Sequence, residues 1–205
     1  MTSPTEDPLF AAWAKISAAS AFFLLFAGGM VTSTGSGLAV PDWPLSFGTL
    51  NPPMLGGIFY EHGHRLIAGC VVMMTVILAA LARRPGANAG ARTAAGLALG
   101  GVMIQALLGG LTVLLRLPPA VSIAHACLGQ AVFCLLLAAA VLASPFHARL
   151  AVNQGGADAG RFAAFGFAAA YLQLALGALV RHTGSGLAWH VLWAAPVAIL
   201  AAFAV

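Results

Sequence analysis

The sequence has little charge. Only 7% of its 205 residues are Asp, Glu, Lys or Arg, whereas 61% are hydrophobic and the mean hydropathy is +0.96. A soluble core cannot bury that share of apolar surface, and apolar runs of about 20 residues recur along the chain. The composition therefore excludes an ordinary soluble domain or a nucleic-acid-binding protein, and it predicts an all-α integral membrane protein.

Three further features are missing. The opening residues 1–8 are polar and acidic, so they form neither a basic transit peptide nor a cleavable signal, and the first span is expected to be retained. No cysteine lies in a polar loop, because Cys70, Cys127 and Cys134 all fall inside apolar runs, and no disulfide is expected. The glycine-rich stretch 34–37 lacks the strand–helix context of a phosphate-binding loop, which excludes nucleotide binding.

The apolar runs predict five membrane spans and one shorter segment. The spans are expected at about residues 14–32, 62–82, 93–115, 120–143 and 161–181, and residues 190–205 are apolar but marginal in length. With the N-terminus inside, most of the nine Lys and Arg residues face the cytoplasm, as the positive-inside rule requires. We therefore expect a multi-pass protein of a bacterial inner membrane with a cytoplasmic N-terminus.

One motif occurs twice. Thr34-Gly35-Ser36-Gly37-Leu38-Ala39 returns 149 residues later as Thr183-Gly184-Ser185-Gly186-Leu187-Ala188, and each copy ends an outward-going span. The repeat unit is thus four helices, which predicts bundles related by an axis along the membrane normal. The expected organisation is a cytoplasmic N-terminus at 1–13, a four-helix bundle at 14–143, a cytoplasmic linker at 144–160 and an incomplete second, parallel repeat at 161–205.

The second predicted span opens with an unusual density of ionisable groups, Glu61-His62-Gly63-His64-Arg65. His64 and His125 lie at matched depth near the outer ends of two helices, where two imidazoles can bind one haem iron. Glu61 precedes His64 by three residues and shares its helix face, and Arg65 can pair with a haem propionate. The pattern alone is equally compatible with interfacial polar residues that bind no ligand.

Together these motifs resemble the haem A synthase family of cytochrome oxidase assembly proteins. The resemblance covers residues 14–189 and is carried by Gly35-Ser36-Gly37-Leu38-Ala39, Pro41-Asp42-Trp43-Pro44, Glu61-x-x-His64-Arg65 and His125. It implies an eight-helix protein of two four-helix bundles that oxidises a methyl group of haem O to a formyl group. In this family the substrate haem O lies between the residues matching His64 and His125, the residue matching Glu61 is the catalytic carboxylate, and a haem B occupies the C-terminal half.

After Ala188 the second copy departs from the family pattern. His190 aligns by the repeat with Pro41 rather than with His64, so the resemblance assigns it no iron, and C-terminal ligands for haem B are not found. The leading interpretation is a haem A synthase-like oxidoreductase whose partners are membrane lipid, haem O and either a second copy or a haem O synthase. The alternatives are a non-catalytic b-type cytochrome or haem carrier, and a degenerate remnant without haem.

Overall fold

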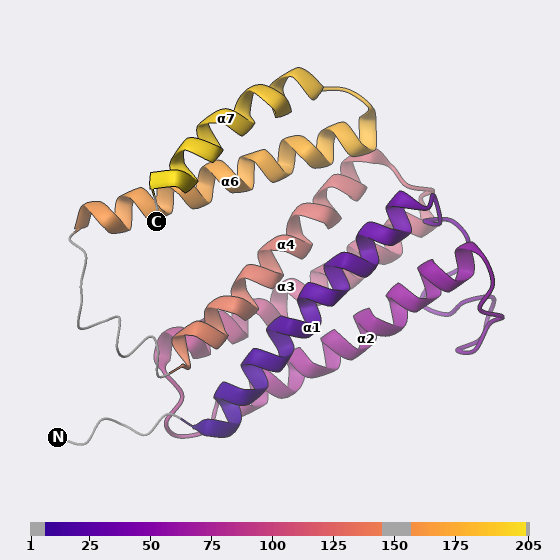
Figure 1. Ribbon diagram of the computed structural model, residues 1–205. Helices are drawn as coiled ribbons and strands as arrows, with labels where there is room; N and C mark the ends of the chain where they lie inside the picture. The colour runs from indigo at the N-terminus through magenta and orange to yellow at the C-terminus, as the bar shows by residue number, and fades with distance from the viewer. Residues whose placement is uncertain (1–6, 145–156, 204–205) are drawn as a thin grey trace.

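The computed structural model describes residues 7–144 and 157–203 (Figure 1). Residues 1–6 of the expected N-terminal segment 1–13 and residues 145–156 of the expected linker 144–160 therefore lie outside the described residues. The helices are α1 Pro8–Ser33, α2 Gly57–Leu81, α3 Ala89–Leu114, α4 Pro119–Leu142, α6 Ala157–Thr183 and α7 Leu187–Phe203. No strand occurs in these two ranges beyond the isolated bridge between Ser46 and Thr49. The all-α class is confirmed.

Five of these helices are long and apolar enough to cross a membrane, namely α1 to α4 and residues 159–183 of α6. The sixth, α7, has 17 residues and is about 25 Å long, somewhat short of the roughly 30 Å hydrocarbon core of a bilayer. The chain is therefore a multi-pass membrane protein with five to six spans, as predicted.

The first helix begins earlier than the apolar run suggests, at Pro8 rather than near residue 14. Asp7 is its N-cap, and Oδ1 of Asp7 accepts hydrogen bonds from the amides of Leu9 and Phe10. Pro8 occupies the first turn, where its missing N–H costs nothing. Capping chemistry, which hydropathy does not register, thus fixes this boundary.

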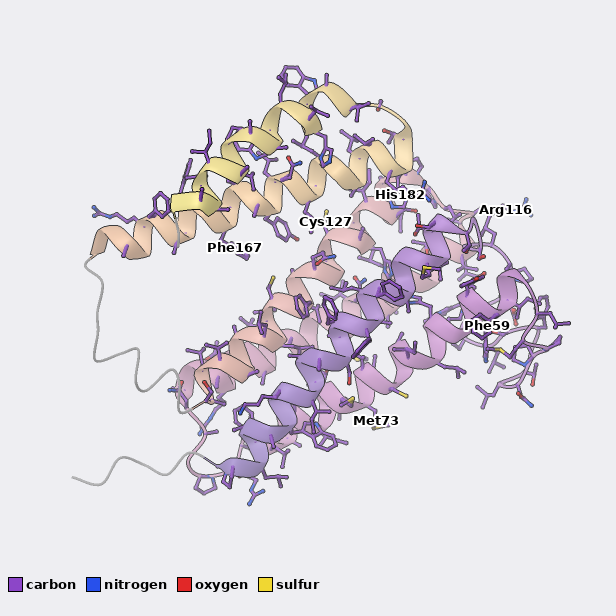
Figure 2. All side chains as sticks on the ribbon, viewed as in Figure 1. Phe59, Met73, Arg116, Cys127, Phe167 and His182 are labelled. Atoms are coloured by element: carbon purple, nitrogen blue, oxygen red, sulfur yellow. The ribbon has the colours of Figure 1, made fainter. Side chains whose placement is uncertain are left out.

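The first four helices form a closed bundle in which α1 packs on α2 and α4, and α3 also packs on α2 and α4 (Figure 1). Helices α2 and α4 therefore occupy opposite corners. The buried seam is largely alanine, which allows close helix approach; it includes Ala14, Ala18, Ala95, Ala98 and Ala139. Large apolar side chains such as Phe23, Phe26 and Met73 are exposed and would meet lipid tails; Met73 is labelled in Figure 2.

The remaining helices form a hairpin, α6–α7, attached to the bundle through α4. The Tyr171 hydroxyl donates to the carbonyl oxygen of Cys127 at 2.8 Å, and Cys127 lies on the side of α4 that faces α6 (Figure 2). The indole N–H of Trp193 in α7 donates to the carbonyl of Ala169 in α6 at 2.9 Å. Among the described residues, α7 packs on no helix other than α6.

Both copies of the sequence repeat adopt the same local structure. Hydroxyl contacts join Thr34 to Ser36 at 2.7 Å and Thr183 to Ser185 at 2.6 Å. The intervening glycines, Gly35 and Gly184, have φ angles of 67° and 69°, a left-handed conformation that favours glycine. The guanidinium of Arg181 also donates to the carbonyl of Thr32, which is its repeat equivalent. The C-terminal end of α6 therefore contacts the C-terminal end of α1, at two positions that are equivalent in the sequence repeat.

Candidate functional site

His64 and His125 face the interior of the bundle from its two opposite corners. His64 lies in the second turn of α2 and His125 in the second turn of α4, both at the end of the bundle where α1 connects to α2 and α3 connects to α4, and both are partly buried. The two histidines therefore lie at similar depth, on helices at opposite corners of the bundle rather than on adjacent helices.

Each imidazole rests against a glycine of a neighbouring helix. A Cβ atom on Gly28 of α1 would lie 3.1 Å from Cε1 of His64, and a Cβ atom on Gly109 of α3 would lie 3.1 Å from Cε1 of His125. The two glycines therefore make room for the rings at the remaining corners of the bundle. The sequence alone does not reveal this role, because small residues in membrane helices are equally typical of close helix packing.

One nitrogen of each ring lacks a partner among residues 7–144 and 157–203. Nδ1 of both His64 and His125 is buried there without a hydrogen bond. An unpaired polar atom in a low-dielectric interior costs about 1–3 kcal/mol, which a ligand for these rings would offset. Imidazole is a common axial ligand of haem iron, and the porphyrin supplies the other four donors.

A metal site built from protein ligands alone is not supported by this arrangement. The described part of the chain contains no group of three or more His, Cys, Asp and Glu residues that could hold a bare metal ion. Two imidazoles that each rest on a glycine and have a buried, unpaired Nδ1 atom fit the axial ligation of a haem.

Gln105 fixes the backbone beside one of these imidazoles. Its side-chain amide donates to the carbonyl oxygen of His125 at 2.9 Å, linking α3 to α4. Interhelical hydrogen bonding is the usual role of an intramembrane amide side chain. Because the bond is to the backbone, it orients the turn that carries the ring and leaves the imidazole itself available.

Glu61 and Arg65 hold the loop before α2 over the mouth of the bundle. Oε2 of Glu61 accepts from the Val40 amide at 2.8 Å, and Oε1 accepts from Arg65 at 2.6 Å. Arg65 also donates through Nη1 to the carbonyls of Asp42 and Leu45 at 2.6 and 2.8 Å, and through Nη2 to that of Val40 at 3.2 Å. The guanidinium and carboxylate thus organise loop backbone, which spacing along the helix could not reveal.

The neighbouring histidine belongs to the loop rather than to the pocket. Nδ1 of His62 lies 2.7 Å from Oγ of Ser46, and both side chains are buried. Of the two histidines at the start of α2, His62 thus has its Nδ1 atom paired, whereas Nδ1 of His64 is buried without a hydrogen bond.

Trp43 anchors the same loop on α3. A Cβ atom on Gly110 would lie 2.7 Å from Cδ2 of Trp43, so the indole ring lies directly on the helix backbone there. Gly110 is adjacent to Gly109, which contacts His125. The loop therefore covers this end of the bundle from α2 to α3, beside the helix turns that carry the two imidazoles.

Asp42 shapes the turn at the tip of this loop. Its two carboxylate oxygens accept from the amides of Phe47 and Gly48, each at 2.7 Å. The Gly48 bond, followed by the Phe47 bond, holds the pKa of Asp42 below its ordinary value of 3.8. At a pH above 3.8 the charged carboxylate therefore stabilises the turn. This stabilisation is lost as the pH falls through the lower pKa that Asp42 has in the folded protein.

Replacing Asp42 with Asn is expected to loosen this turn at neutral pH, because the amide presents a donor to one of the two backbone N–H groups. Limited proteolysis at pH 7 should cleave the 38–56 loop faster in Asp42→Asn than in the wild-type protein. The difference should shrink at pH 3, where the aspartate begins to protonate. Equal cleavage rates at pH 7 would contradict this role.

Comparisons with known proteins identify the family of this chain. Residues 56–199 match the COX15-CtaA family, described as cytochrome oxidase assembly protein. A heme A synthase of Methylobacterium sp. (strain 4-46) is 36% identical over 115 residues, which is 48% of this chain and 31% of that protein. The match thus spans about a third of the length of this relative. No solved structure matches significantly. Since the family match covers more than half of the sequence, the chain belongs to the cytochrome oxidase assembly protein family.

Proposed function

We propose that this chain is a haem A synthase-like membrane oxidoreductase that converts haem O to haem A. The observation that carries the proposal is the pair His64 and His125, which lie on helices at opposite corners of the bundle and each have a buried Nδ1 atom without a hydrogen bond. The name of the Methylobacterium relative supports the same reaction. His64 and His125 would hold the iron of the substrate haem O from opposite corners of the bundle.

The reaction is the oxidation of a ring methyl group to a formyl group. With water as the oxygen source, one methyl group and one water give one formyl group, four protons and four electrons, and the electrons pass to an acceptor outside the chain. The bound haem supplies the methyl group. The protein must hold it, exclude bulk water and take up protons at a defined place.

Glu61 is the proposed proton-handling group. Its side chain is nearly fully buried, at the mouth of the helix that carries His64. The carboxylate is held by Val40 and Arg65, so its position relative to the pocket is fixed. Arg65 is proposed to contribute in two ways, by closing the loop and by presenting its remaining donor capacity to a haem propionate.

The location and partners follow from the same proposal. The protein would lie in a bacterial inner membrane with its N-terminus in the cytoplasm, so that the haem site faces the outer side. Lipid surrounds the exposed apolar faces of the helices. A haem O synthase in the same membrane, or a second copy of this chain, would be its protein partner.

One observation favours a second candidate, a non-catalytic haem-binding cytochrome or haem carrier. Both oxygens of Glu61 are occupied by loop and guanidinium donors, and neither bonds to His64. On this alternative, Glu61 would serve only to hold the loop. The protein would then cycle the redox state of its haem and leave the methyl group unchanged.

Haem analysis of the purified protein tests both candidates. We would extract the haem from detergent-solubilised protein, separate it by chromatography, and then incubate protein with haem O and an electron acceptor. Haem O or haem A in the extract, with formation of the formyl product, is the expected result. Haem B alone without conversion would favour the cytochrome, and protein without haem would overturn both.

A further inference from the structure

Lys15 is the only charged residue of helix α1 and the only lysine of the chain. The ion pair between Asp7 and Arg84, at 3.1 Å, marks the polar boundary at the N-terminal end of this helix. Lys15 follows Asp7 by eight residues, which places its backbone about 12 Å deeper along the helix axis. A charged side chain at that depth of a bilayer is costly, so it usually pairs with another group.

The carboxylates of residues 7–144 do not neutralise Lys15. Asp7 and Glu61 each form an ion pair with an arginine. Asp42 accepts from backbone amides in the loop at the opposite end of the bundle. The side chain of Lys15 is itself exposed, so its charge faces the surroundings of the bundle rather than its interior. A counter-charge for this ammonium group therefore has to approach from the membrane side.

A groove of about 320 Å³ begins at Lys15 and runs between α1 and α4. Its floor is made of small buried side chains, Ala18 and Ala140. Its far end lies at Phe22 and Phe133, whose ring centroids are 6.1 Å apart. Seven residues separate Lys15 from Phe22, so the groove extends for about 10 Å along α1. It thus combines one cation at its shallow end with an apolar channel that leads toward the middle of the bilayer.

A second groove of similar size contains no charge. It has a volume of about 300 Å³, lies between α1 and α2, and is lined by Ser20, Phe23, Leu66, Ile67, Cys70 and Val71. Acyl chains can occupy either groove, because both are apolar and open to the membrane. Only the groove between α1 and α4 also holds a group that distinguishes one lipid headgroup from another. Charge complementarity therefore favours a lipid of negative net charge at Lys15.

We propose that the groove between α1 and α4 binds one phospholipid with an anionic headgroup. The headgroup phosphate pairs with the ammonium group of Lys15, which reaches toward the membrane surface on its flexible stem. One acyl chain of the same lipid lies over Ala18 and Ala19 and ends at Phe22 and Phe133. With a cytoplasmic N-terminus the lipid belongs to the inner leaflet, whose surface potential is negative. The bound lipid thereby bridges α1 and α4 and supplies the missing counter-charge.

Native mass spectrometry of the full chain tests the proposal. Delipidated protein in detergent would be titrated with phosphatidylglycerol and, separately, with phosphatidylcholine of the same acyl chains, and the Kd of the first bound lipid measured. The wild-type protein should bind phosphatidylglycerol roughly fivefold more tightly, the attraction typical of one lysine at an anionic membrane surface. Lys15→Gln should abolish this preference, whereas Lys15→Arg should retain it. Equal affinity for the two lipids in the wild type, or an unchanged preference in Lys15→Gln, would overturn the proposal.

The two grooves supply a matched pair of variants. Ala19→Trp should fill the groove between α1 and α4 and weaken binding of phosphatidylglycerol, whereas Cys70→Trp should fill the other groove and leave that binding unchanged. Both positions are exposed, so the added ring does not enter the bundle core. Phosphatidylglycerol should likewise raise the Tm of the wild type and of Cys70→Trp, but not that of Ala19→Trp. Equal losses in the two variants would overturn the assignment to this groove. None of these outcomes depends on haem, so failure here leaves the proposed function intact.

Discussion

Replacing His64 or His125 with Ala is expected to remove haem O from the α1–α4 bundle. Each variant deletes one of the two uncommitted imidazoles that face the bundle centre. Loss of a group that merely orients a metal ligand costs roughly 10–100-fold in affinity, so loss of the ligand itself should lower haem O content by more than about tenfold. Haem extracted from purified protein and separated by chromatography gives the measurement.

The controls for this experiment lie next to the tested residues. His62→Gln should keep its haem O, because His62 bonds to Ser46 rather than facing the pocket. Gly28→Leu should reduce haem O content by pushing the His64 ring aside, whereas Gly29→Leu should not, since nothing lies within 4 Å of a Cβ atom at that position. Full haem O content in both His64→Ala and His125→Ala would show that these histidines are not the ligands.

Replacing Glu61 with Gln is expected to abolish most of the conversion of haem O while leaving haem bound. The glutamine keeps the size of the side chain but cannot accept a proton as a carboxylate does, and general acid–base groups contribute about 100-fold or more to rate. Its amide would also face a donor, either Arg65 or the Val40 amide. Formyl haem produced per unit of bound haem is the quantity to measure.

The companion variant Arg65→Gln distinguishes chemistry from loop closure. Like Glu61→Gln, this variant breaks the mostly buried ion pair between Glu61 and Arg65. It also leaves the loop carbonyls without their donor, but it retains the Glu61 carboxylate. If Glu61 handles protons, Glu61→Gln should slow conversion far more than Arg65→Gln does. Equal losses in the two variants would mean that Glu61 acts only by holding the loop.

Some features follow from the sequence because they depend on composition and local pattern. Apolar length predicts the spans, since a bilayer accepts only segments that bury their own backbone polar groups. The twice-used TGSGLA motif predicts two similar helix ends, and both form the same hydroxyl pair. His64 and His125 could be singled out because ionisable groups inside a membrane are costly and therefore stand out.

Other features depend on contacts between residues far apart in the chain. Arg65 donates to backbone carbonyl groups of residues 20 to 25 positions away. Because every residue has a backbone carbonyl, the sequence does not indicate which ones Arg65 will bind. The opposition of His64 and His125 depends on which helices occupy opposite corners of the bundle. Residue periodicity states which face of a helix is apolar, but it does not state which neighbour that face meets.

His190 shows the division most clearly. The sequence by itself determined that the chain is an all-α membrane protein with a repeated helix ending and two histidines at matched depth. Only the tertiary structure decided that a third histidine, out of register with the repeat, lies on Gly177 as the other two lie on Gly28 and Gly109. The physical reason is that an imidazole ring can approach a neighbouring helix this closely only where the residue opposite has no side chain. Which glycine lies opposite which histidine is set by the packing of the two helices of each hairpin.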